Sequence, residues 1–245
     1  MIETSQPGPA AERGYPFWTY LDVLLFFLAM LPSGVLAYGS LWAVKRISGA
    51  AAWPKAVDLL SLQFVTYLLW FLALSALFKL KYDRDFWQSL RWNASVDAIG
   101  TWTMLGPALA FAVGLAGSAL DTPKIRTPME ELLDERTSLV LVGVFASTLG
   151  PLSEELAFRG FLQPIVTRSL GPVAGIVIPA ALFAVPHLPQ YAWSWRHITL
   201  IGLAGVAFGW ARFRSGSTAA ATGFHATYNL TFVLLYAFRG DTFPP

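Results

Sequence analysis

The sequence predicts an all-α protein, a polytopic transmembrane helical bundle of about seven to eight helices. Of its 245 residues, 55% are hydrophobic and only 13% are charged, whereas soluble domains carry roughly 25% charged residues. The mean hydropathy of +0.52 points the same way. Several stretches reach the ~20 apolar residues that a helix needs to cross a bilayer, and no alternating pattern of a membrane β-barrel is visible. We therefore expect most of the chain to be surrounded by lipid.

The apolar stretches place the individual helices. We expect membrane helices at residues 18–43, 56–80, 95–120, 138–153 with a continuation through 154–168, 173–187, 197–213 and 218–238. Residues 1–16 are polar and rich in Pro and Gly, which is typical of a disordered tail. They lack the basic start of a signal peptide, so the first apolar stretch is interpreted as a retained helix.

Two charged connectors interrupt the N-terminal helices. Residues 79–94 mix charges with aromatic side chains, which suits an amphipathic segment at the membrane surface. Residues 121–137 are strongly charged, and a short helix is plausible over 129–135. A solvated linker is an equally good interpretation of both connectors.

Charge and cysteine content exclude several function classes. A net charge of +2 without a basic cluster does not indicate a surface that binds nucleic acid. The absence of Cys excludes disulfides, thiolate metal sites and a Cys nucleophile. The sequence has three histidines, so any imidazole chemistry must come from His187, His197 or His225. His197 follows an aromatic stretch typical of the membrane interface, so we leave it out of the candidate site.

Ionisable residues inside membrane helices are costly and mark functional hypotheses. Glu154, Glu155 and Arg159 lie between strongly apolar flanks. Glu155 and Arg159 are spaced i,i+4 and can pair on one helix face, whereas Glu154 points about 100° away. The pairing would neutralise Glu155 and leave Glu154 free. A purely structural Glu–Arg pair between helices is the alternative.

Two further apolar segments carry isolated polar side chains. His187 stands near the end of one segment, one turn after Phe183, and His225 and Asn229 are spaced i,i+4 on the last. Each alone fits a structural residue or hydrogen-bond contact between helices. Their occurrence together with the acidic pair favours a shared polar site.

The three motifs Glu-Glu-x-x-x-Arg (154–159), Phe-x-x-x-His (183–187) and His-x-x-x-Asn (225–229), in this order, resemble the CPBP family of intramembrane proteases. That family includes the type 2 CAAX prenyl endopeptidases and bacterial proteins linked to bacteriocin processing and immunity. Residues 208–217 also look like the stretch leading to the third motif. The resemblance covers about residues 138–235. It implies a catalytic membrane core at 138–240, preceded by membrane helices and charged connectors at 17–137, in a bacterial inner membrane.

The resemblance also implies residue roles. Glu154 and His187 would activate a water, while His225 and Asn229 would stabilise the oxyanion or complete the site. Glu155, Arg159 and Phe183 would support them. The family has been described both as metalloendopeptidases and as glutamate-type proteases, so the resemblance leaves the cofactor open. Zinc would use Glu154, His187 and His225, but no His-Glu-x-x-His signature is present. Because Asn229 suits an oxyanion better than zinc, the metal-free form is favoured.

The implied partners are membrane lipid and a peptide or protein substrate, prenylated or otherwise associated with the membrane.

Other intramembrane protease classes lack their motifs here, since there is no Cys, no Gly-x-Ser-Gly and no pair of Asp residues within the spans. Two alternatives to an enzyme stay open: a non-enzymatic immunity or scaffold protein of the same fold, and a small transporter. Four intact motif residues favour the enzyme, and the lack of inverted repeats argues against the transporter.

Overall fold

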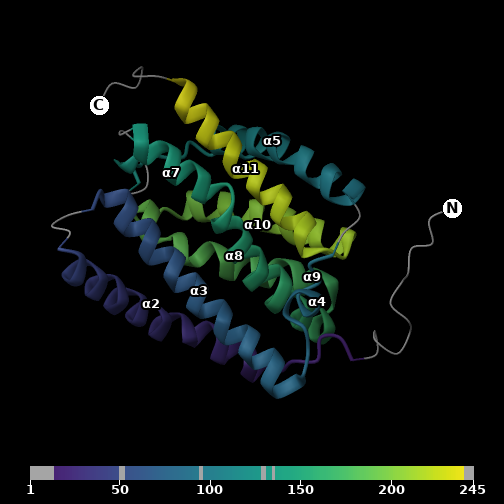
Figure 1. Ribbon diagram of the computed structural model, residues 1–245. Coiled ribbons are helices and arrows are strands. Elements are labelled where there is room, and N and C mark those ends of the chain that lie inside the picture. Colours follow the sequence, from purple (N-terminus) through teal and green to yellow (C-terminus); the bar gives the residue numbers. More distant parts are fainter. Residues whose placement is uncertain (1–13, 50–52, 94–95, 128–130, 134–135, 240–245) are drawn as a thin grey trace.

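The computed structural model describes residues 14–49, 53–93, 96–127, 131–133 and 136–239, and within these ranges it is all-α without strands (Figure 1). Its helices of eleven residues or more are α2 (Tyr20–Ser48), α3 (Lys55–Tyr82), α5 (Val96–Ala119), α7 (Arg136–Ala146), α9 (Gln163–Ala184), α10 (Trp195–Ser215) and α11 (Thr218–Arg239). Shorter elements are α4 (Phe86–Ser89), α8 (Leu149–Glu155), the π-helix η1 (Leu156–Leu162) and the 3₁₀ turns η2 (Val185–His187) and η3 (Pro189–Tyr191).

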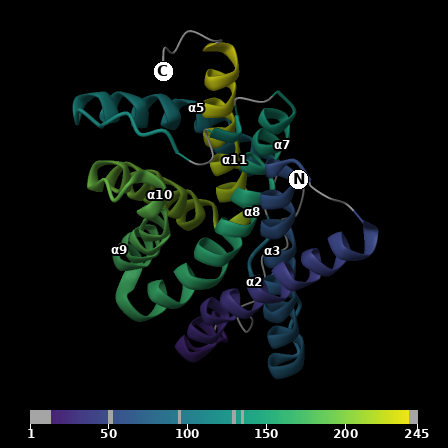
Figure 2. The same ribbon diagram turned by 90° about the vertical axis from the view of Figure 1, so that its left-hand side faces the viewer.

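Within the described residues, four helical stretches are long and apolar enough to cross a membrane, which indicates an integral membrane protein. They are Tyr20–Ser48, Lys55–Tyr82, Ala98–Ala119 and Arg136–His187. The last stretch is not one straight rod. At Gly171 the backbone adopts φ +85° and ψ 172°, a conformation that only glycine adopts without strain. The chain reverses there, so that the part of α9 before Gly171, which continues α8 and η1, and the part after it lie as two arms (Figure 2).

The expected helices are present, with one difference. Residues 138–153 were expected as one helix, but α7 ends at Ala146 and α8 begins at Leu149. The hydroxyls of Ser147 and Thr148 donate back to the carbonyls of Gly143 and Val144, each over 2.5 Å. Such side-chain bonds compete with the helical ladder and accompany the break just before the acidic pair.

The connectors and the tail are described only in part. The short helix considered for 129–135 falls largely outside the described residues, as does the tail over 1–13. Tyr15 and Pro16, at the end of the expected tail, pack against the core, and the Pro16 carbonyl accepts a hydrogen bond from Arg168. In the connector at 79–94, α4 begins at a hydrogen-bonded cap formed by Asp85.

An aromatic core fixes the segment that carries the acidic pair. Phe26 of α2 stacks on Trp70 of α3 with ring centroids 4.2 Å apart. Phe26 also meets Phe161 of η1 edge-on at 5.1 Å. The indole of Trp18 donates to the carbonyl of Phe161 over 3.1 Å. Buried aromatic contacts of this kind are strongly stabilising, so α2 and α3 serve as a rigid support for η1.

Helix α11 is held by a close approach of α5. A Cβ placed on Gly106 would lie 2.6 Å from the backbone nitrogen of Tyr228 and 2.8 Å from the carbonyl carbon of Thr227. Beside this contact, the hydroxyl of Thr227 donates to the carbonyl of Thr103 over 2.6 Å. The small residue at 106 therefore lets α5 press directly against the part of α11 between His225 and Asn229.

Candidate active site

The acidic pair stands where the helix geometry changes. Glu154 and Glu155 end α8, and the π-helix η1 follows at once. At its end the amide of Gln163 donates to the carbonyl of Phe158, five residues back. Single π-helical turns inside α-helices are rare and occur frequently at functional sites. The local backbone thus singles out this segment independently of its charges.

Glu155 is the centre of a buried ionic cluster. Arg159 Nη1 donates to Glu155 Oε1 over 2.8 Å, so the pair expected from the i,i+4 spacing is present. His225 Nδ1 donates to the same oxygen over 2.9 Å. The other Arg159 amino group donates to the carbonyl of Gly205 on α10 over 2.8 Å. The cluster therefore joins α8, η1, α10 and α11 through one carboxylate.

The ring of His225 is held in one orientation. Because an ionised carboxylate only accepts, Nδ1 carries a proton toward Glu155, and Nε2 faces Glu154 Oε2 at 3.7 Å. Phe208 stacks on the imidazole at 4.3 Å and 16°, while Phe183 meets it edge-on at 5.8 Å. The 3.7 Å separation is longer than a hydrogen bond. Nε2 and the Glu154 carboxylate consequently face one another without being bound.

The two glutamates differ sharply in access. The side chain of Glu154 is 27% exposed, whereas that of Glu155 is 0% exposed and that of His225 is 4% exposed. Glu154 is therefore the carboxylate that a water or a substrate can reach. Glu155 has no free path to either.

His187 lies close to Glu154 and presents a free ring nitrogen. It interacts electrostatically with Glu154. Its Nδ1 lies 3.0 Å from the carbonyl of Phe183. A carbonyl only accepts, so Nδ1 carries the proton and Nε2 of the neutral ring keeps its lone pair. The 3₁₀ turn η2 places this half-buried imidazole at the end of α9.

Asn229 has a different partner from the rest of the set. Its Nδ2 donates to the carbonyl of Ala146, the last residue of α7, over 2.8 Å. The carbonyls at a helix end have no intrahelical partner, so Asn229 satisfies one of them. His197, left out of the site, bonds Ser194 Oγ through Nδ1 at 2.9 Å and stacks on Tyr191.

The structure adds residues that lie outside the three motifs. Gly205 and Phe208 on α10 contact Arg159 and His225, as described above. Tyr67 on α3 interacts electrostatically with Glu154, and its hydroxyl accepts from Gln63 Nε2 over 2.8 Å. Gln63 and Tyr67 are spaced i,i+4 within an apolar span, the same signal that marked His225 and Asn229.

A metal centre does not fit the side chains as they are arranged. Among the residues that the structure describes, no group of three or more His, Asp or Glu side chains is placed to hold a metal ion. This applies to Glu154, His187 and His225, the set considered for zinc. In addition, His225 Nδ1 is engaged with Glu155.

Comparison with protein families matches residues 136–231 to the family described as type II CAAX prenyl endopeptidase, Rce1-like. The matched range contains Glu154, Glu155, Arg159, His187, His225 and Asn229. Comparison with the curated proteins found no match. Comparison with the solved structures also found none.

Proposed function

Because residues 136–231 form a domain of the Rce1-like type II CAAX prenyl endopeptidase family, we propose that this protein is an intramembrane endopeptidase in which Glu154 and His187 activate the hydrolytic water. The family implies a membrane protease acting on a protein substrate. One observation carries the finer proposal. Glu154 is the accessible carboxylate of the pair, facing His225 Nε2 at 3.7 Å beside an ionic cluster that is otherwise closed.

The hydrolytic step begins with the water. A water hydrogen-bonded to Glu154 gives its proton to the carboxylate while its oxygen attacks the peptide carbonyl carbon. His187 Nε2 accepts the second hydrogen bond of that water and orients it. The electron pair of the carbonyl bond moves to oxygen and creates an oxyanion. Glu154, now protonated, returns its proton to the peptide nitrogen as the C–N bond breaks.

The oxyanion needs donors that are already in place. In its protonated form His225 donates through Nε2, and the negative charge of Glu155 stabilises that imidazolium from the other side. Arg159 supplies the counter-charge of Glu155. One N–H of the Asn229 amide is bonded to Ala146, and we propose that the second N–H of the same amide donates to the oxyanion.

The substrate class follows from the place of the site. Glu154 lies in a stretch long and apolar enough to span the membrane, so a substrate must reach it from lipid or from the membrane surface. We propose a membrane-associated peptide or protein, with a prenylated chain end as one form. The lipid part would keep such a chain at the depth of the site.

Membrane proteomics tests the proposed activity. Cells carrying the Glu154→Ala variant are compared with cells carrying the wild-type protein, with Glu131→Ala as the control because Glu131 is an exposed carboxylate outside the cluster. We expect at least one membrane protein to persist uncleaved in the Glu154→Ala membranes alone. Identical peptide termini in all three membranes would contradict the proteolytic function and favour the scaffold alternative.

A further inference from the structure

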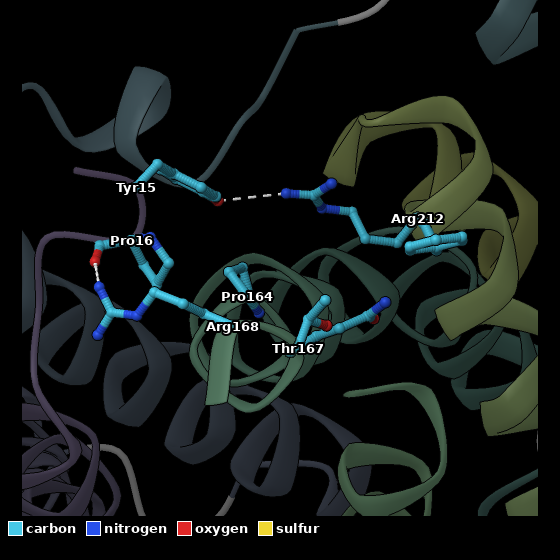
Figure 3. A pocket seen from close by; sticks show the side chains of 8 residues that line it. Tyr15, Pro16, Pro164, Thr167, Arg168 and Arg212 are labelled. Carbon is cyan, nitrogen blue, oxygen red and sulfur yellow. Dashed lines mark hydrogen bonds between the residues drawn. The ribbon is translucent and has the colours of Figure 1, made fainter. Parts of the chain in front are cut away.

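A cavity with two arginines in its wall lies away from the glutamate cluster, at one end of the bundle. It has a volume of about 310 Å³ and lies between the start of α9, the end of α10 and the segment before α2 (Figure 3). Tyr15, Thr167, Arg168 and Arg212 are among the side chains that line it. None of the residues proposed for hydrolysis contributes to its wall.

Among the residues that the structure describes, Arg212 is a buried cation without an anionic partner. The residue is 7% exposed. Its Nε donates to Thr218 Oγ1 over 3.1 Å, and its Nη2 donates to the hydroxyl of Tyr15 over 3.2 Å. Both acceptors are neutral hydroxyls, and the other charged group that acts on Arg212 is Arg91. An unpaired buried charge is strongly destabilising, so this guanidinium is suited to receive an anion.

Two further arginines add to the same positive charge. Arg168 lines the cavity from α9, and its Nη1 donates to the carbonyl of Pro16. Arg91 lies over the ring of Tyr15, 4.3 Å from its centroid. Within the described part of the chain, none of these three guanidinium groups has a carboxylate within ion-pair distance.

Two lysines at this end of the bundle are paired. Lys79 contacts Asp83 at 2.5 Å, and Lys81 contacts Asp22 at 2.6 Å. Guanidinium groups present planar pairs of N–H donors, which match the oxygens of phosphate and carboxylate groups.

We propose that this cavity binds a phosphate group, with Arg212 and Arg168 as the donors. The surroundings point to a lipid headgroup as its source, because the cavity lies where α2 begins and α10 ends, among aromatic and basic side chains typical of the membrane interface. Free phosphate offers the same chemistry. The inference does not depend on the proteolytic activity, and its test uses no substrate.

The test measures ligand retention by the purified full-length protein in detergent. Native mass spectrometry compares phosphatidic acid with diacylglycerol, which has the same chains without the phosphate, and titration calorimetry measures inorganic phosphate. The variants are Arg168→Gln and Arg212→Gln. The matched control is Arg214→Gln, because Arg214 also lies at the end of α10 but stands over Trp210 outside the cavity. Arg168→Gln keeps the test valid if the buried Arg212→Gln variant fails to fold, since Arg168 is exposed.

We expect phosphatidic acid to be retained in preference to diacylglycerol. Arg168→Gln and Arg212→Gln should each weaken binding roughly tenfold or more, the range for a lost charge-assisted hydrogen bond, while Arg214→Gln should change it less than about twofold. Binding of inorganic phosphate without phosphatidic acid would support the site and assign a soluble ligand. Equal retention of the two lipids without phosphate binding would overturn the proposal. Equal losses in Arg168→Gln and Arg214→Gln would overturn it as well.

Discussion

At the residue scale, two adjacent glutamates occupy opposite environments. Glu155 is closed off and shared between Arg159 and His225, whereas Glu154 is partly open and unbound. The i,i+4 spacing predicted the bond from Arg159, because neighbours on one helix face are fixed by helix geometry. The bond from His225 could not be predicted, since it depends on how α11 packs against α8.

The first prediction concerns this ionic cluster. Glu155→Gln removes the carboxylate bonded to Arg159 and leaves the buried guanidinium without that counter-charge. We expect the free energy of unfolding to fall by roughly 3–5 kcal/mol, measured by denaturant unfolding of the detergent-solubilised protein. Glu131→Gln, at an exposed carboxylate, should unfold like the wild type. An equally stable Glu155→Gln protein would show that the cluster is not structural.

A second prediction separates the two roles of the Asn229 amide. Asn229→Ala removes a donor that we propose for the oxyanion, so kcat should fall by about 10²–10³ with little change in KM. Steady-state kinetics on a cleaved substrate measures this split. If KM rose while kcat stayed the same, Asn229 would act in substrate binding or in holding the end of α7, and the oxyanion role would be wrong.

At the element scale, the site is assembled from helices that are each held by an identifiable contact. The aromatic core of α2 and α3 supports η1, and α5 presses on α11 through Gly106. The sequence predicted each helix to within a few residues, since apolar length and periodicity are local properties. It did not predict the break between α7 and α8, where Ser147 and Thr148 bond to the preceding turn.

The contact between α5 and α11 gives a third prediction. Gly106→Ala places a methyl group against the backbone of Thr227 and Tyr228, so α11 must shift and carry His225 with it. We expect a loss of about 1–3 kcal/mol of stability, typical of overpacking, together with reduced cleavage. Gly114→Ala on the same helix is the control, because nothing lies within 4 Å of a Cβ there. Thermal unfolding that ranks the two variants equally would contradict this packing.

At the scale of the whole molecule, the fold class and the candidate residues could be predicted, but their assembly could not. Charged groups in apolar helices identified Glu154, Glu155 and Arg159 because lipid makes such groups costly. Patterns in one chain carry no distances between helices. The interaction of Tyr67 with Glu154 and the cavity at Arg212 depend on such distances, so the sequence alone could not predict either.

The proposed metal-free hydrolysis gives a fourth prediction, which belongs to the scale of the whole molecule. The side chains are not placed to share a metal ion, so hydrolysis should persist after treatment with strong chelators. Cleavage assays combined with metal analysis of the treated protein check this. Activity that disappears with the metal and returns with one equivalent of zinc would contradict the metal-free mechanism while leaving the protease assignment intact.

The central claim is that Glu154 supplies the base for hydrolysis. The most direct measurement compares purified wild-type protein, Glu154→Gln and Glu131→Gln in lipid nanodiscs, with a substrate found by membrane proteomics, and quantifies the cleaved peptide by mass spectrometry. We predict that wild type and Glu131→Gln cleave at similar rates. Glu154→Gln should yield no product although its melting temperature is close to that of the wild type. Full cleavage by a folded Glu154→Gln protein would contradict the account.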